Sequence, residues 1–191
     1  MKSAGLILSA GESRRMGSPK ALLNFRGETF LNRLIRVFSF HCDPVIVVLG
    51  ATAEDIRSRL ARPARIVVNE DWRSGQTSSM QCGLRAVPPD AEGVLFTLVD
   101  HPAVTPQTVE ALLRPGAGRI RVPRFAGRRG HPIWFSRDLI AGFLALPVSG
   151  AARDVVRSHA AETEFLDVND PGILADIDDP AAYRSLIGAE A

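Results

Sequence analysis

The sequence is poor in cysteine and lacks long hydrophobic runs. Only two of its 191 residues are cysteines. Both Cys42 and Cys82 lie among apolar residues without the spacing of metal ligands, so we expect free thiols rather than a disulfide or a metal site. The longest early apolar run, Ala4 to Ala10, is far shorter than the roughly 20 residues that a membrane span requires. We therefore expect a cytoplasmic protein without a signal peptide or a membrane-spanning helix.

A large excess of charge of either sign is also absent. The chain has 23 Lys and Arg residues against 21 Asp and Glu, a formal net charge of +2. Such a balance does not attract nucleic acid or a membrane surface as a whole, so neither is an expected partner. Local basic stretches, at Arg14-Arg15 and at 119–129, suit a small phosphorylated ligand better. The length suits one domain, 1–191, that would bury about 70% of its unfolded surface.

Three familiar catalytic signatures are missing as well. The sequence contains neither a P-loop, nor the G-x-G-x-x-G dinucleotide fingerprint, nor a G-x-S-x-G nucleophile elbow. The first apolar run leads instead into a basic loop with two glycines, Gly11-Glu-Ser-Arg-Arg-Met-Gly-Ser-Pro-Lys20. Glycine lets backbone amides approach phosphate oxygens, and basic residues supply the charge. Phosphate binding is the favoured interpretation, and a flexible surface loop is the alternative.

Short β-branched runs alternate with segments that carry apolar residues at helical spacing, which is typical of an α/β domain with a mainly parallel sheet. Strands are predicted at 4–9, 44–49, 65–69, 93–99, 119–123, 132–135 and 164–168. Helices are predicted at 29–38, 52–60 with Thr52 as N-cap, 78–87, 105–113, 138–146, 151–159 and after Asp179. The segments around 126–130 suggest a small antiparallel excursion.

Carboxylates follow two of the apolar runs. Asp100 ends the run 93–99, while Asp176 and Asp178 would share one face of a further short strand by period-2 geometry. Carboxylates together with phosphate oxygens are the ligands that Mg²⁺ prefers. Asp100 and Asp178, with Asp176, therefore predict a magnesium site, although Asp100 alone could equally cap a helix or anchor a turn.

Two other groups admit more than one interpretation. Ser78, Ser79 and Gly83 lie in the first turns of an expected helix, where hydroxyls either cap the helix or contact a nucleoside. His131, within Arg129-Gly130-His131-Pro132, has no partner nearby in sequence that would make it a general base. A structural or substrate-binding role is favoured for it.

The stretch Leu8-Ser-Ala-Gly-Glu-Ser-Arg-Arg-Met-Gly-Ser-Pro-Lys-Ala-Leu-Leu resembles the opening signature of the MobA-like NTP-transferase family. Further segments of the family pattern follow in order: Asn69-Glu-Asp-Trp72, Gly75-Gln-Thr-Ser-Ser79, Asp100-His-Pro102, Arg129-Gly-His-Pro132 and Asp176-Ile-Asp-Asp-Pro180. The resemblance thus covers almost the whole chain. Ala10, where the family's guanylyltransferases usually carry a second glycine, looks more like its molybdenum-cofactor cytidylyltransferases.

This resemblance implies a three-layer α/β/α Rossmann-like fold of the nucleotide-diphospho-sugar transferase type. It also implies magnesium-dependent transfer of CMP from CTP to a phosphorylated acceptor, molybdopterin above all, with release of pyrophosphate. Position by position, it assigns nucleotide binding to Ser9, Ala10, Gly11, Ser13, Arg14, Gly17, Ser78, Ser79 and Gly83; catalysis to Arg15, Lys20 and Asp100; Mg²⁺ binding to Asp100, Asp178 and Asp176; and acceptor binding to Arg129, Gly130, His131 and Pro132.

The chain departs from the family pattern in places. His101 replaces the methionine or glutamine usual between the aspartate and the proline, and Ser9 stands where alanine is common. Alternative functions are a guanylyltransferase, a sugar- or alcohol-phosphate nucleotidyltransferase, and a non-catalytic nucleotide-binding maturation factor of molybdenum enzymes. A molybdoenzyme apoprotein is a further expected partner, and a monomer or weak homo-oligomer the expected state.

Overall fold

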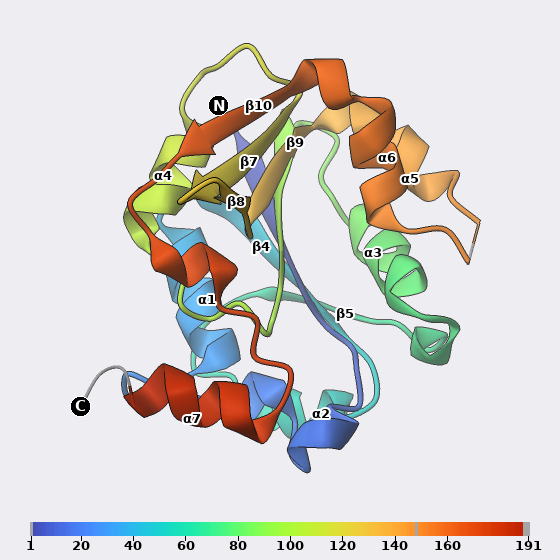
Figure 1. The fold of residues 1–191 in the computed structure, drawn as a ribbon. Coiled ribbons are helices and arrows are strands. Elements are labelled where there is room, and N and C mark those ends of the chain that lie inside the picture. The colour runs from blue at the N-terminus through green and yellow to red at the C-terminus, as the bar shows by residue number, and fades with distance from the viewer. Residues whose placement is uncertain (1, 148, 189–191) are drawn as a thin grey trace.

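A computed structural model, which describes residues 2–147 and 149–188, shows one central sheet with helices on both faces (Figure 1). The sheet has the order β10-β7-β9-β6-β1-β4-β5, with β8 paired to β7. Within this sheet, as far as the structure describes it, β8 and β9 pair antiparallel with their neighbours and the other pairs are parallel. The strands are β1 (Ser3–Ser9), β4 (Cys42–Leu49), β5 (Arg65–Val68), β6 (Gly93–Leu98), β7 (Ile120–Phe125), β8 (Arg128–Arg129), β9 (Ile133–Ser136) and β10 (Thr163–Asp167). The predicted α/β class, mainly parallel with a small antiparallel part, is confirmed.

Helices pack on both sides of this sheet. In Figure 1, α1 (Phe30–Ser39) and α4 (Pro106–Leu113) lie to the left, and α3 (Gln76–Leu84), α5 (Ile140–Leu144) and α6 (Ala152–Ser158) to the right. Helices α2 (Ala53–Ser58) and α7 (Pro180–Gly188) lie at the bottom of that view. The short elements are the hairpin β2 (Asn24–Phe25) and β3 (Glu28–Thr29) and the 3-10 turns η1 (Arg14–Met16), η2 (Lys20–Leu22), η3 (Trp72–Ser74), η4 (Arg137–Leu139), η5 (Ala160–Glu162) and η6 (Pro171–Leu174).

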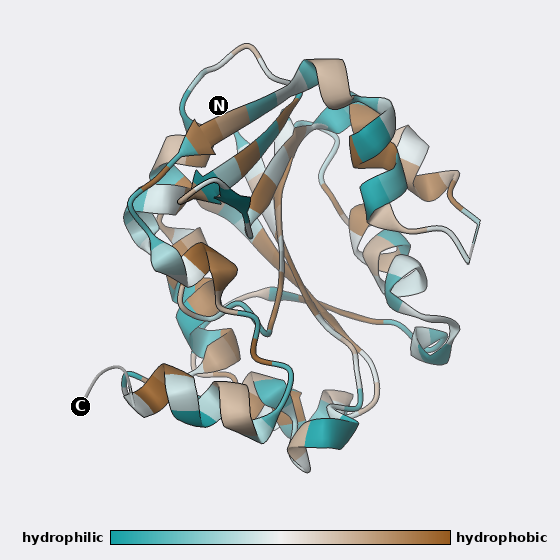
Figure 2. Cartoon of the chain, in the orientation of Figure 1, coloured by the Kyte–Doolittle hydropathy of each residue, from teal (hydrophilic) through white to brown (hydrophobic). Residues whose placement is uncertain are grey.

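Two apolar cores, one on each face, hold the layers together. Along β1 the buried side chains alternate, with Leu6 in the core beneath α3 and Ile7 in the core beneath α1. In Figure 2 the strands in the middle of the sheet are mostly hydrophobic, and the helices on either side carry both hydrophobic and hydrophilic residues. A strand covered on both sides must be apolar at nearly every position, which explains the unbroken apolar runs.

Three local predictions were wrong. Helix α3 begins at Gln76 rather than at residue 78, with Gly75 as its N-cap. The side chain of Thr52 makes no capping hydrogen bond. Residues 175–178 form no strand, because no neighbouring strand is available to them and the amide of Ile177 donates to the Asp100 carbonyl instead (2.9 Å).

Other local predictions are confirmed. The hydroxyl of Thr105 caps α4, with Pro106 in its first turn. Asp179 accepts hydrogen bonds from the amides of Ala181 and Ala182 at the start of α7 (2.9 Å each). Both cysteines are free, and burial raises the pKa of Cys42 to about 12. Within the described residues no helix has the length and apolar character to cross a membrane.

Asp170 ties the segment before α7 to the sheet. Its carboxylate, 4% exposed, accepts hydrogen bonds from the Thr105 amide (2.9 Å) and hydroxyl (2.8 Å), from the Thr108 hydroxyl (2.6 Å) and from the Gly172 amide (2.9 Å). These bonds join the start of α4 to η6, and η6 leads directly into Asp176 and Asp178.

We predict that Asp170→Ala lowers the free energy of unfolding by about 3 kcal/mol, because it leaves several buried donors without an acceptor. Urea denaturation followed by circular dichroism measures the loss. The control is Asp179→Ala, which removes an exposed helix cap and should cost only about 1 kcal/mol. Equal losses in the two variants would contradict this account of Asp170.

Candidate active site

The loop after β1 and the residue after β6 meet at the point where the sheet connections diverge. Strand β1 lies between β4 and β6, with Leu8 opposite Leu98, and the Val99 amide donates to the Leu8 carbonyl (3.0 Å). In open α/β sheets, ligands bind in the crevice at the carboxyl ends of the strands beside such a point. The pairing of β1 with β6 therefore brings the basic loop next to Asp100.

A pocket of about 780 Å³ opens at this place. That volume is within the usual range for a small-molecule or cofactor site. Ten of the residues expected at the site line it: Ser9, Ala10, Gly11, Ser13, Arg14, Arg15, Lys20, Ser79, Asp100 and Asp178. Residues from both ends of the chain thus converge on one cavity.

The basic loop folds back on itself and exposes its arginines. Ser13 and Gly17 adopt left-handed backbone conformations (φ 54° and 68°), and the Ser13 hydroxyl accepts from the Lys20 amide (3.0 Å). Arg14 pairs with Glu12. Arg15 is 75% exposed and lies 3.6 Å from Asp178. A loop that is closed by its own hydrogen bond and exposes guanidinium groups can bind the anionic group of a ligand in the pocket.

Lys20 connects two of the carboxylates that were predicted to bind the metal. Its Nζ donates to Asp100 Oδ2 (3.0 Å) and Asp178 Oδ1 (2.6 Å), and its side chain is only 12% exposed. Burial lowers the pKa of Lys20, but Asp178 and Asp100 outweigh this effect and raise it above its ordinary value. The hydrogen bond from Lys20 in turn lowers the pKa of Asp178. Lys20 therefore stays protonated inside the pocket.

The other oxygen of Asp100 faces a second group of side chains. Asp100, His101 and Asp176 each offer a ligand atom, and these atoms lie within 4.8 Å of one another. Asp100 Oδ1 is buried and has no hydrogen-bond partner among the described residues. Burial, together with repulsion from Asp100, raises the pKa of Asp176. A divalent cation would relieve both the repulsion and the unpartnered oxygen, so these residues fit a metal ion.

The wall formed by η3 and α3 was only partly predicted. Asn69 donates to the hydroxyls of both Ser78 and Ser79 (3.0 Å each), but only Ser79 lines the pocket. Trp72 and Gln76 line it too, although they are not among the residues predicted for the site. Their place in the 69–79 motif was the available signal.

Two expected nucleotide contacts lie elsewhere. A Cβ on Gly83 would come 2.5 Å from Leu6 Cδ1 and 2.6 Å from Val48 Cγ2. Glycine at 83 therefore serves close packing of α3 on the sheet, which corrects its assignment to the nucleotide. Gly17 closes the loop and does not line the pocket.

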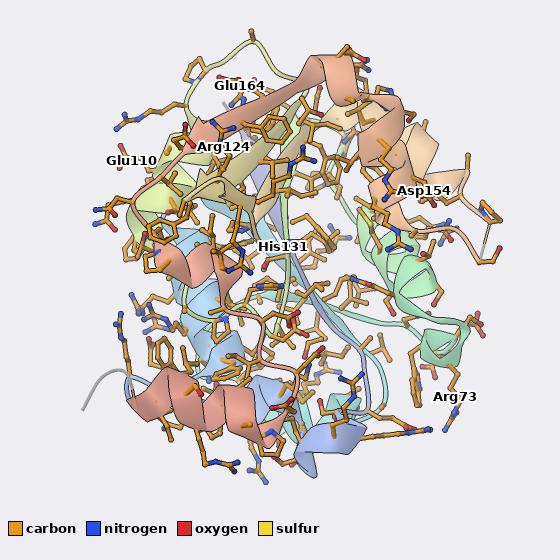
Figure 3. All side chains as sticks on the ribbon, viewed as in Figure 1. Arg73, Glu110, Arg124, His131, Asp154 and Glu164 are labelled. Carbon is orange, nitrogen blue, oxygen red and sulfur yellow. The ribbon has the colours of Figure 1, made fainter. Side chains whose placement is uncertain are left out.

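The segment 129–132, expected to bind the acceptor, also lies outside the pocket lining. Arg129 stacks over Phe165 (4.4 Å), and Gly130 packs against the Ile173 carbonyl. The His131 ring lies 4.6 Å from that of His101, and burial with the neighbouring His101 lowers the pKa of His131 to about 4. Pro132 is buried. Figure 3 places His131 near the centre of the molecule and Arg73 at the rim. The contact of the His131 ring with His101 connects this segment to the acidic cluster.

The basic loop, the pocket and the acidic cluster, at the crossover of a mainly parallel sheet, define a Rossmann-like nucleotide-binding protein. The chain belongs to the MobA-like NTP transferase domain family, whose model matches residues 5–163. This is a family of nucleotidyltransferases, so the resemblance seen in the sequence is confirmed.

Relatives of the chain carry different names. It is 36% identical over 188 residues to "Nicotine blue oxidoreductase" of Paenarthrobacter nicotinovorans, covering 91% of each chain. It is 28% identical over 200 residues to "Probable molybdenum cofactor guanylyltransferase" of Mycobacterium avium, covering 100% of this chain and 98% of that protein. The crystal structure of Rv0371c from Mycobacterium tuberculosis matches with a TM-score of 0.86 and 33% identity over 98% of each chain. A manganese complex of Rv0371c matches with a TM-score of 0.82 and 31% identity, over 99% of this chain and 100% of that one.

We predict that Lys20→Met strengthens Mn²⁺ binding about tenfold in the absence of nucleotide, because it removes a positive charge that holds Asp100 and Asp178. Isothermal titration calorimetry with MnCl₂ measures the change. Arg15→Met is the matched control, since Arg15 is exposed and pairs with Asp178 at 3.6 Å; its effect should stay below about twofold. Unchanged Mn²⁺ affinity in Lys20→Met would show that the ammonium does not compete with the ion.

Proposed function

We propose that this protein transfers CMP from CTP to a phosphorylated small-molecule acceptor, molybdopterin, and releases pyrophosphate. The observation that carries the proposal is the position of Lys20, buried between Asp100 and Asp178 in a pocket lined by the basic loop. The name of the Mycobacterium avium relative supports an acceptor of the molybdenum cofactor type. We further propose that 1–191 works as one cytoplasmic domain, as a monomer or weak homo-oligomer, and that it meets a molybdoenzyme apoprotein.

The reaction needs no protein nucleophile. An acceptor phosphate oxygen attacks the α-phosphorus of the nucleotide, and the bond from that phosphorus to the bridging oxygen breaks as pyrophosphate leaves. The main obstacle is repulsion between two anions, so positioning and positive charge supply the catalysis. Lys20 and Arg15 neutralise the triphosphate, and the loop from Ser9 to Gly17 offers it backbone amides.

Asp100 and Asp176 would hold a divalent cation, which we propose to be Mg²⁺ in the cell. When bound, it would neutralise part of the phosphate charge. This ligand set omits Asp178 from the expected set of Asp100, Asp178 and Asp176, because Asp178 is engaged by Lys20 and Arg15. In this proposal Asp178 positions Lys20 rather than the metal.

The proposed choice of cytosine over guanine rests on Ala10, which lines the pocket. Ala10 is 7% exposed there, and its carbonyl accepts from the Ala51 amide (3.1 Å). A side chain at this position leaves less room than glycine would, which favours cytosine over the larger guanine. GTP is the second candidate, because curated relatives are named as guanylyltransferases. Protein unfolding with each NTP and Mg²⁺ separates the two, since a ligand at 100 times its Kd stabilises by about 2.7 kcal/mol.

We predict that pyrophosphate release from CTP, with molybdopterin and Mg²⁺, falls at least about 100-fold in Lys20→Ala and in Asp100→Ala, with little loss of stability. A coupled pyrophosphate assay with CTP, GTP, ATP and UTP measures it. Lys2→Ala is the control, because Lys2 also pairs with an aspartate, Asp90, but next to the opposite end of β1. Because one relative is named an oxidoreductase, detection of pyrophosphate as the product decides whether this protein is a transferase. Absence of pyrophosphate with every NTP would refute the transferase proposal.

A further inference from the structure

His101 is a buried side chain that the proposed transfer chemistry does not use. It follows Asp100 directly at the end of β6 and is 7% exposed. Its Nδ1 is buried and has no hydrogen-bond partner within the described part of the chain. In a neutral imidazole one ring nitrogen carries a lone pair, which is available to a ligand.

Two carboxylates lie beside this ring. His101 Nε2 is 3.9 Å from Asp100 Oδ1, and a carboxylate oxygen of Asp176 completes a set of ligand atoms within 4.8 Å of one another. Asp100 Oδ1 is itself buried and has no hydrogen-bond partner among residues 2–147 and 149–188, while Lys20 binds the other oxygen. The unpartnered oxygen of Asp100, the ring nitrogen of His101 that lies 3.9 Å from it and the Asp176 carboxylate therefore point to the same missing ligand, a cation.

The backbone holds the contributing segments in register. The Ile177 amide donates to the Asp100 carbonyl (2.9 Å), which fixes Asp176 beside the turn after β6. On the other side, the His131 amide donates to the Ile173 carbonyl (3.0 Å), and the His131 ring stacks on His101. These contacts preorganise the group, as a metal site requires. Asp176 is exposed, so an ion can reach the group from solvent.

We propose that His101 is a metal ligand, together with Asp100 and Asp176, and that its nitrogen makes the site prefer Mn²⁺ to Mg²⁺. Mg²⁺ binds oxygen ligands and keeps much of its water, whereas imidazole is a good ligand for transition metals. With three protein ligands, the remaining coordination positions stay open to water or phosphate oxygens. The proposal deepens the proposed function, because it concerns the ion of the same site, but binding of the ion alone does not depend on nucleotidyl transfer.

The test uses Mn²⁺ alone as the probe on the full chain, without nucleotide. Pulsed electron paramagnetic resonance of the Mn²⁺-loaded protein should show modulation from a directly bound histidine nitrogen. The modulation should disappear in His101→Gln. By calorimetry, the same variant should bind Mn²⁺ at least about tenfold more weakly, while its Mg²⁺ affinity changes less than about twofold.

His131→Gln is the matched control, because its ring lies 4.6 Å from His101 but outside the set of ligand atoms. It should keep the nitrogen modulation. A wild-type protein without the modulation overturns the proposal whether or not the variants fold, and so does a signal that survives in His101→Gln. An equal loss of Mn²⁺ and Mg²⁺ affinity in that variant also overturns the metal preference.

The outcomes separate this inference from the proposed function. A histidine signal in a protein that releases no pyrophosphate from any NTP would sustain the ligand assignment and refute the transferase. An active transferase without the histidine signal would sustain the proposed function and refute the ligand assignment. Circular dichroism of His101→Gln and His101→Asn shows whether each variant keeps the native fold.

Discussion

The site depends on how the carboxylate of Asp100 is shared. One oxygen accepts from Lys20, and the other turns toward His101 and Asp176. Asp100 thereby orients the ammonium group of Lys20, which would contact the triphosphate. The same carboxylate contributes an oxygen to the group of side chains that fits a metal ion. This sharing is possible because Asp100 stands at the carboxyl end of a buried strand, where the side chain leaves the apolar interior but remains largely shielded from water.

The site is completed by residues that lie far apart in the sequence. Lys20 and Asp178 are 158 residues apart in sequence, and their hydrogen bond of 2.6 Å joins the first loop to the segment before the last helix. That segment has no sheet neighbour of its own. Asp170 fixes its start and the bond from Ile177 to Asp100 fixes its end, so buried hydrogen bonds replace a strand ladder. Stability and site geometry are consequently linked through the same few polar contacts.

The sequence predicted what local chemistry determines. The apolar runs marked the buried strands, Thr105-Pro106 marked the start of α4, and the glycines and arginines after β1 marked the loop. The wrong predictions concern long-range contacts. The alternation around Ile177 suggested a strand, but a strand needs a neighbour that no local pattern reveals. Gly83 was assigned to the nucleotide, although its reason is the approach of α3 to Leu6 and Val48, which only the packed structure shows.

The difference between local sequence patterns and long-range contacts also bears on substrate specificity. Family membership and the crossover position account for a pocket of this size beside Asp100, yet relatives of the chain are named for different activities. What differs among such proteins must lie in side chains that face the pocket from distant parts of the sequence. Here Trp72 and Gln76 face the pocket from one wall, and His101 lies beside the acidic cluster. As a ligand, His101 would change the chemistry most, because it would add a nitrogen to a group that otherwise offers only carboxylate oxygens.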